Sequence, residues 1–177
     1  AIFDAISEKP VAQQSVKKLT AFGVSLGDDY RVIQGKLACN KKMFGMDNNE
    51  KYGFQISCEN HKFNGQNGKI VYNFSHNRKL TSLTANIEYE HDMLQAEIEF
   101  LKNYDKPAID NEKIRRDGKW IREYCWGECK LHDNKPNEYW SGNKDIWCKN
   151  NLPCLILKVY NVNEQFVEVS LKDDRAS

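Results

Sequence analysis

Hydrophobic and polar residues alternate with a period of two along much of the first half of the chain. The clearest case is residues 80–90, where leucine, alanine, isoleucine and tyrosine alternate with serine, threonine, asparagine and glutamate. The segments with this alternation are residues 30–39, 52–58, 69–75 and 80–90. The pattern predicts a four-stranded antiparallel meander over residues 30–90, with one buried face and one face in solvent. Between the first two strands, the polar residues 40–51 are expected to form a loop.

Two segments have the three-and-four-residue spacing of apolar side chains that is typical of an amphipathic helix. The first is residues 6–20, where Pro10 suits a first turn, so an N-terminal helix is predicted to begin there. The second is residues 92–104, with Asp92 as the N-cap. We expect this central helix to cover the apolar side of the sheet with a wide apolar face, formed by Leu94, Ile98 and Leu101 and the flanking Met93, Phe100 and Tyr104.

The second half of the chain contains a region rich in cysteine and tryptophan, followed by a hairpin, together at residues 119–172. A charged connector at 110–118 precedes a predicted strand at 119–126, and an aromatic-rich loop is expected at 138–147. Two alternating segments near the C-terminus predict the hairpin. No composition change or linker divides the 177 residues, so the sequence predicts one α+β domain, residues 1–177, with about six to seven antiparallel strands.

Composition narrows the possible classes of protein. Hydrophobic residues make up 40% of the chain and charged residues 29%, which is typical of a folded globular protein. The net charge of +1 gives no overall field to attract nucleic acid, and we expect no nucleic-acid partner. The longest apolar run, residues 152–157, is far shorter than the roughly 20 residues of a membrane span. A chain that begins Ala-Ile-Phe is expected to be either an exported protein after signal-peptide removal or a trimmed sequence.

Six cysteines allow three interpretations. A zinc tetrathiolate of Cys125, Cys129, Cys148 and Cys154, with His132 as a spare ligand, needs closer pair spacing than the sequence has. A redox centre needs two residues between the thiols, and Cys125 and Cys129 have three. Disulfides are favoured, with Cys39–Cys58 as the first choice and the other four cysteines joined among themselves. This predicts an oxidising compartment, periplasmic or extracellular, and neither a metal nor a cofactor.

The sequence contains none of the common catalytic or phosphate-binding motifs. His61 and His76 flank the third predicted strand, in loops that are expected to lie close together, and either could act as a general base. Exposed loop histidines are the simpler interpretation. A small secreted hydrolase that uses His61 or His76 with a carboxylate remains an alternative, and no residue is assigned as catalytic.

Aromatic and basic residues indicate a binding surface. All four tryptophans lie between residues 120 and 147, and tryptophan, tyrosine and arginine are common at protein interfaces. The predicted partner-binding residues are Arg115, Arg116, Lys135, Tyr139 and Trp140. We therefore expect a non-enzymatic binding protein, such as an inhibitor or immunity protein that blocks a toxin or lytic enzyme. A structural component of the cell envelope is a further alternative.

Overall fold

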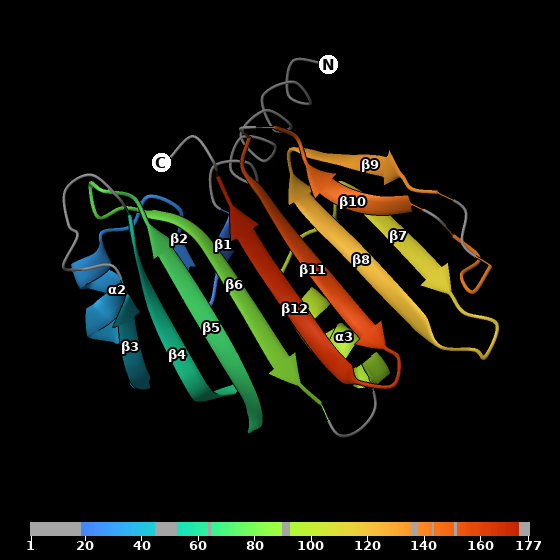
Figure 1. Ribbon diagram of the computed structural model, residues 1–177, viewed down its shortest axis with the longest axis horizontal. Helices are drawn as coiled ribbons and strands as arrows, with labels where there is room; N and C mark the ends of the chain where they lie inside the picture. Colours follow the sequence, from blue (N-terminus) through green and yellow to red (C-terminus); the bar gives the residue numbers. More distant parts are fainter. Residues whose placement is uncertain are drawn as a thin grey trace, which may run out of the picture.

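The computed structural model describes residues 19–44, 53–63, 65–89, 93–135, 138–142, 144–150 and 152–173. Its largest element is an eight-stranded antiparallel sheet with β3 and β7 at its edges (Figure 1). In spatial order the strands are β3 (Asn40–Phe44), β4 (Phe54–Phe63), β5 (Gln66–Phe74), β6 (Leu80–Glu88), β12 (Gln165–Lys172), β11 (Cys154–Asn161), β8 (Trp120–Gly127) and β7 (Ile109–Ile114). The predicted antiparallel sheet is confirmed, with more strands than the six to seven expected.

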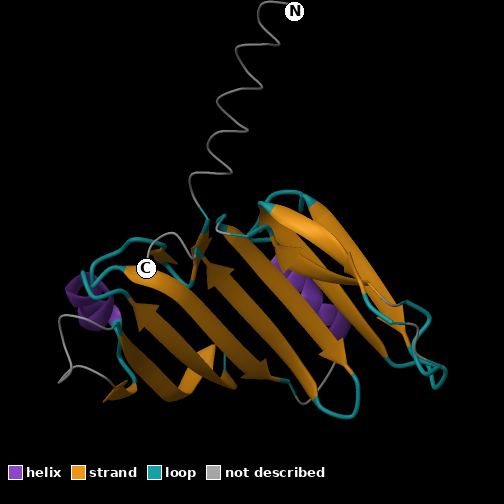
Figure 2. Cartoon of the chain, turned by 45° about the horizontal axis from the view of Figure 1, so that its top comes forward, coloured by secondary structure: helices purple, strands orange, loops and turns teal. Residues whose placement is uncertain are grey.

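Two small hairpins and two helices complete the described part of the chain. They are β1 (Thr20–Ala21) with β2 (Val24–Ser25), β9 (Cys129–Asp133) with β10 (Lys144–Cys148), α2 (Tyr30–Lys36) and α3 (Met93–Leu101). α3 lies on one side of the main sheet and the β9–β10 hairpin on the other (Figure 2). No helix among the described residues is long and apolar enough to cross a membrane.

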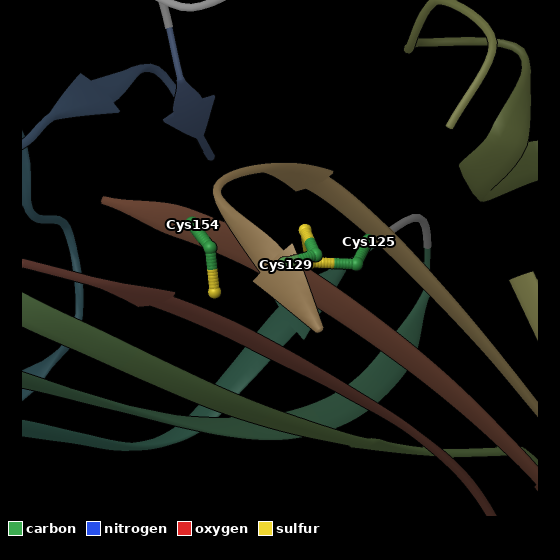
Figure 3. Close-up of side chains that lie close together, drawn as sticks. All are labelled: Cys125, Cys129 and Cys154. Atoms are coloured by element: carbon green, nitrogen blue, oxygen red, sulfur yellow. A yellow bond between two sulfur atoms is a disulfide. The ribbon is translucent and has the colours of Figure 1, made fainter. Parts of the chain in front are cut away.

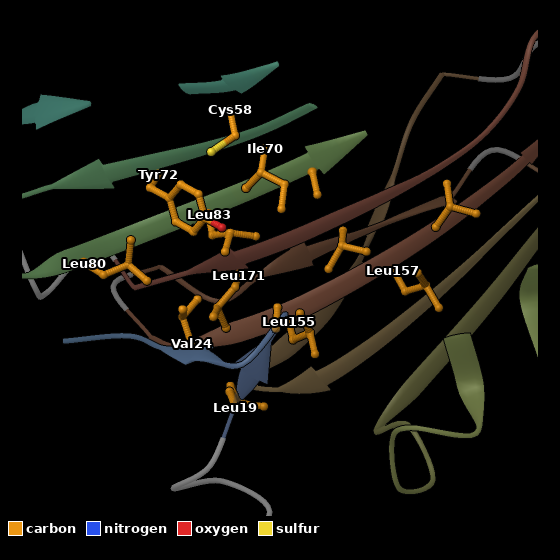
Figure 4. Packing of buried hydrophobic residues seen from close by; sticks show 14 of the residues in the cluster. Leu19, Val24, Cys58, Ile70, Tyr72, Leu80, Leu83, Leu155, Leu157 and Leu171 are labelled. Carbon is orange, nitrogen blue, oxygen red and sulfur yellow. The ribbon is translucent and has the colours of Figure 1, made fainter. Parts of the chain in front are cut away.

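The α3 side of the sheet carries the hydrophobic core (Figure 4). Leu83 and Ala85 of β6 are completely buried, as their alternation predicts, and pair with Leu171 and Val169 of β12. The buried residues of this core extend from Leu19 to Leu171 along the sequence. The opposite side is polar over β4, β5 and β6, where side-chain hydrogen bonds run across the strands. It becomes apolar beneath the β9–β10 hairpin.

The prediction of a strand over residues 30–39 is wrong, because this segment begins with helix α2. Asp29 caps the helix by accepting the N–H of Arg31 at 2.9 Å. Ile33 is completely buried, and Tyr30 and Leu37 pack against the same core, which is a helical spacing. The first strand of the meander is β3, which lies within the segment expected to be a polar loop.

α3 covers the apolar side of the sheet, as predicted, and Met93, Phe100, Leu101 and Tyr104 of the expected apolar face pack in or against the core. Met93, Ala96 and Glu97 are buried, whereas Leu94 and Ile98 are 51% and 58% exposed. Glu97 is held towards the sheet by Arg122 of β8, whose Nη1 lies 3.0 Å from Glu97 Oε1. The orientation of α3, with Glu97 towards the sheet, is therefore accompanied by an ion pair. The pattern of apolar residues does not reveal this ion pair.

Besides β3, other strands occur where no strand was expected. β7 lies in the charged connector, β9 lies between the predicted strand 119–126 and the aromatic-rich loop 138–147, and β10 overlaps the end of that loop. β7 is an edge strand with alternating charged residues, a common composition at sheet edges that obscures the apolar periodicity. The predicted N-terminal helix lies almost entirely outside the described residues, and at its end Thr20 begins β1. The predicted C-terminal hairpin is formed by β11 and β12.

Candidate partner-binding site

The β9–β10 hairpin packs on the main sheet through a second, smaller core. Ile146 of β10 is 1% exposed and faces the sheet. The buried residues of this core are Cys125, Cys129, Ile146, Cys154 and Ile156. None of the four tryptophans belongs to this buried set, and Trp126 is buried in the main core instead. The cysteines and isoleucines therefore hold the hairpin on the sheet.

Two disulfides join the base of the hairpin to the sheet. Cys125 of β8 is bonded to Cys129 of β9 (Figure 3), and Cys148 of β10 is bonded to Cys154 of β11. Because each strand of the hairpin has its own disulfide, both are attached at the same end. The third disulfide joins Cys39 and Cys58, the pair that the sequence favours, although Cys39 lies between α2 and β3 and not at the end of a strand.

The glycine between Cys125 and Cys129 has a specific role. Gly127 has a φ of +93°, in the left-handed region that favours glycine. A Cβ at this position would lie 2.7 Å from the carbonyl oxygen of Pro153. The chain can therefore leave β8 and begin β9 close to β11 because residue 127 has no side chain.

A buried carboxylate attaches the middle of the hairpin. Glu123 of β8 is 1% exposed, and its Oε2 accepts the backbone N–H of Ile146 at 3.2 Å. Its Oε1 accepts a hydrogen bond from Asn111 Nδ2 at 3.2 Å. Lys113 and Lys158 place their Nζ atoms 3.6 and 3.8 Å from the two carboxylate oxygens. Two cations and two hydrogen-bond donors thus compensate for the burial of this charge.

Asp145 of β10 extends this network at the edge of the hairpin. It forms an ion pair with Lys113 and accepts a hydrogen bond from Asn134. Burial acts to raise the pKa of Asp145, but the hydrogen bonds from Lys113 and Asn134 outweigh it, so that the pKa lies below its usual value. The charged form of Asp145 is therefore favoured in the folded protein.

Four of the five predicted partner-binding residues meet where the β7–β8 turn touches the β9–β10 loop. Arg115 and Trp140 form an isolated antiparallel bridge, and the Arg115 guanidinium carbon lies 5.7 Å from the Trp140 ring centroid. The N–H of Arg116 donates to the carbonyl oxygen of Tyr139 at 3.2 Å. We call Arg115, Arg116, Tyr139 and Trp140 the loop-end surface. Lys135 is exposed on the other arm of the same loop.

The loop-end surface has one strongly exposed aromatic residue and one salt-bridged arginine. Tyr139 is 70% exposed, which is unusual for a large aromatic side chain. Arg115 is paired with Asp117 at 2.7 Å, whereas Arg116 is exposed and takes part in none of the ion pairs between described residues. Arg116 and Tyr139 are therefore the members best placed to meet a partner.

A second aromatic feature on the hairpin was missed by the sequence interpretation. His132 of β9 stacks on Trp147 of β10, with ring centroids 3.8 Å apart and planes 9° from parallel. Trp147 remains 45% exposed, and Leu131 nearby is 43% exposed. Only the β9–β10 register, which pairs Asp145 with His132 and Trp147 with Lys130, brings these side chains together.

The histidines of the hydrolase alternative are separated, contrary to the expectation that their loops lie close together. The backbone of His61 pairs with Gly68 near one end of β5, whereas the exposed His76 follows its other end. Nine residues of strand span about 25–30 Å. Among the described residues, no hydrogen bond or ion pair joins His76 to a carboxylate, so no catalytic pair is evident there.

Three sulfur atoms, of Cys125, Cys129 and Cys154, lie within 4.8 Å of one another (Figure 3). All belong to disulfides, and zinc requires thiolates, so the tetrathiolate interpretation does not fit this arrangement.

Comparisons with protein-family models, curated proteins and solved structures gave no match. The geometry of the chain is therefore the basis for its proposed function.

Proposed function

We propose that this chain is an exported, non-enzymatic binding protein whose loop-end surface binds another protein. The specific form we favour is an inhibitor or immunity protein that blocks a partner enzyme. The observation that carries the proposal is the backbone pairing that joins Arg115 to Trp140 and Arg116 to Tyr139. It brings aromatic and arginine side chains from two separate turns onto one surface.

The attachment of the hairpin supports binding, because a preformed surface loses little conformational entropy when it binds. Two disulfides hold its base, and Glu123 holds its middle. The loop-end surface lies beyond these attachments. Such a surface needs little reordering to fit a partner.

The side chains suggest the chemistry of the partner. Tyrosine, tryptophan and arginine are over-represented among the residues that contribute most to protein–protein affinity. Arg116 is an exposed cation next to Tyr139, and Lys135 is exposed on the other arm of the same loop. An acidic rim around an apolar recess on the partner, as at the mouth of many active sites, would complement this arrangement.

The proposed export is supported by the disulfides. All six cysteines are paired, and such bonds persist chiefly in oxidising compartments. A periplasmic or extracellular location agrees with this pairing. A partner is therefore to be sought among exported or invading proteins.

A capture experiment tests the proposal. The tagged protein is incubated with the secreted and envelope proteins of its source, and captured proteins are identified for the wild type, for Arg116→Glu with Tyr139→Ala, and for Lys106→Glu. Lys106 is an exposed lysine outside the hairpin and serves as the charge control. We expect an enzyme that binds the wild type and the control but not the double variant, and whose turnover falls when the wild type is added.

Other outcomes would contradict the proposal at different points. Equal capture by the double variant would mean that the loop-end surface is not the contact. A specifically captured protein whose activity is unchanged would exclude the inhibitor form and favour a structural role in the envelope. Turnover of a substrate by the chain itself, abolished by His76→Ala, would favour the hydrolase.

A further inference from the structure

The two disulfides at the base of the hairpin lie next to each other. The sulfur atoms of Cys125, Cys129 and Cys154 are all within 4.8 Å of one another, although Cys154 is bonded to Cys148 (Figure 3). Thiol–disulfide exchange proceeds by attack of a thiolate on a disulfide sulfur. A thiolate at Cys154 would therefore have a second disulfide beside it in the folded protein.

The register of the hairpin offers a different partner for Cys148. Cys148 of β10 is directly opposite Cys129 of β9. Opposite residues of antiparallel strands have Cα atoms about 4.5–5.5 Å apart, within the usual disulfide range of about 4.4–6.8 Å. Cys125 and Cys154 occupy diagonal positions on the paired strands β8 and β11, because Cys154 is opposite Gly127. The four cysteines can therefore be joined in a second way, as Cys129–Cys148 with Cys125–Cys154.

The second pairing changes what the disulfides attach. In the observed pairing, each strand of the hairpin is bonded to a strand of the main sheet. In the second pairing, Cys129–Cys148 joins the two hairpin strands to each other, and Cys125–Cys154 joins two neighbouring strands of the main sheet. Diagonal Cα atoms are about 7–8 Å apart, so the latter bond requires a small shift at the ends of β8 and β11. The observed pairing is therefore expected to be the more stable one.

Cys148 is the point at which an external thiol can enter this cluster. It is partly exposed, whereas Cys125, Cys129 and Cys154 are buried. Attack on the Cys148 sulfur releases Cys154 as the leaving group. Lys172 of β12 is directly opposite Cys154 and so lies on the same face of the sheet. An ammonium group in this position favours the thiolate form that a leaving group requires.

We propose that these four cysteines form a thiol–disulfide exchange site, at which an external thiol converts the observed pairing into the second pairing. The thiolate attacks Cys148 Sγ and forms a mixed disulfide there, and the electron pair of the broken bond stays on Cys154. Cys154 then attacks Cys125 Sγ and releases Cys129 as a thiolate. Cys129 attacks Cys148 Sγ, which releases the external thiolate again. Each step breaks one S–S bond and forms one, so no oxidant or reductant is consumed.

The exchange controls how firmly the hairpin is attached. After it, β10 has no covalent bond to the main sheet, and the small core and the hydrogen bond from Ile146 to Glu123 remain to hold it. The exchange site does not depend on the proposed function, because no step involves a partner at the loop-end surface.

Disulfide mapping of the full chain tests the site. The folded protein is incubated with glutathione at about pH 8, where an ordinary thiol is partly ionised, and exchange is then stopped with acid. Remaining thiols are alkylated in denaturant, and the chain is cut with trypsin and a glutamate-specific protease. Cleavage after Glu128, Lys130 and Lys149 separates all four cysteines, so each link is identified by mass. We expect Cys129–Cys148 and Cys125–Cys154 peptides to appear together and in equal amounts.

Two single-cysteine variants isolate the middle step. Cys148→Ser leaves a permanent thiol at Cys154, beside the Cys125–Cys129 bond. We expect the alkyl label to be shared between Cys154 and Cys129, without any added thiol.

Cys39→Ser is the matched control. It leaves a buried thiol at Cys58, which lies in the main core on the other side of the sheet from the cluster. Its label is expected to stay entirely on Cys58.

Three outcomes would overturn the proposal. The first is the absence of both new links from the glutathione-treated wild type, and this result decides even if Cys148→Ser fails to fold. The second is label confined to Cys154 in a folded Cys148→Ser variant. The third is a link between Cys39 or Cys58 and any cysteine of the cluster, because exchange would then follow unfolding and not the arrangement of the hairpin.

Discussion

Glu123 Oε2 accepts the backbone N–H of Ile146 at 3.2 Å, so a side chain of β8 holds the main chain of β10. Ordinary strand pairing connects β10 to β9 in the small sheet, whereas this hydrogen bond connects it to the main sheet. The hairpin therefore has a polar attachment in its middle as well as two covalent attachments at its base. This relationship leads to the first prediction.

Glu123→Ala is expected to lower the free energy of unfolding by about 3–5 kcal/mol, because it removes the buried carboxylate that pairs with Lys113 and Lys158 and leaves the Ile146 N–H without its acceptor. Urea unfolding measures the change. Glu128→Ala is the control, since its pair with Lys149 is solvent-exposed and such pairs contribute about 0–1 kcal/mol. Equal losses in the two variants would show that the Glu123 network does not hold the hairpin.

Asp145 is expected to make the stability depend on pH on the acid side. Its pKa is lower in the folded protein than its ordinary value of 3.8. Its stabilising effect is therefore fully present above that value, and is lost as the pH falls through the lower, folded-state pKa. Asp145→Asn should flatten the acid limb of a Tm-against-pH curve. A limb of unchanged slope would contradict this assignment.

Gly127→Ala is expected to destabilise the fold more than Gly118→Ala. Both glycines have positive φ, but a Cβ at residue 127 would meet the Pro153 carbonyl oxygen at 2.7 Å, whereas residue 118 has open space around it. The backbone term alone is about 1–2 kcal/mol for each alanine. Thermal unfolding of the two variants compares them directly. A Gly118 variant at least as unstable as the Gly127 variant would refute the close approach.

Removing individual disulfides should cost stability according to the length of the loop that each closes. The Cys148–Cys154 bond has a sequence separation of 6 and the Cys39–Cys58 bond one of 19. Chain-entropy arguments give losses of about 2 and about 3 kcal/mol for the paired serine variants. Urea unfolding under non-reducing conditions measures both. A reversed order would mean that the hairpin bond contributes mainly through native contacts.

The sequence predicted those strands that bury one apolar face in the core and leave the other face polar. β6 alternates cleanly because one face lies in the core, whereas the inward positions of β7 include Asn111 and Lys113, which bond to Glu123. Apolar periodicity cannot identify a strand that faces a polar network. The missed helix α2 had a local signal, namely Asp29 as the cap followed by Tyr30, Ile33 and Leu37.

The composition of the chain identified residues of the candidate site, but it could not predict how they are arranged in space. Clustering of tryptophan and arginine identified Arg115 and Trp140, yet only the fold pairs them. The His132–Trp147 stack depends on a strand register that was unknown. The burial of Glu97 on α3 is likewise not visible in the apolar spacing, because it accompanies an ion pair with Arg122 of β8.

The most direct test of the central claim is photo-cross-linking from the loop-end surface. The photoreactive amino acid p-benzoylphenylalanine replaces Tyr139 in one protein and Lys106 in another, and each is irradiated with the secreted and envelope proteins of the source. We predict one covalent adduct with an enzyme from position 139 and none from position 106. No adduct from position 139, or the same adduct from both positions, would contradict the claim that this surface binds a partner.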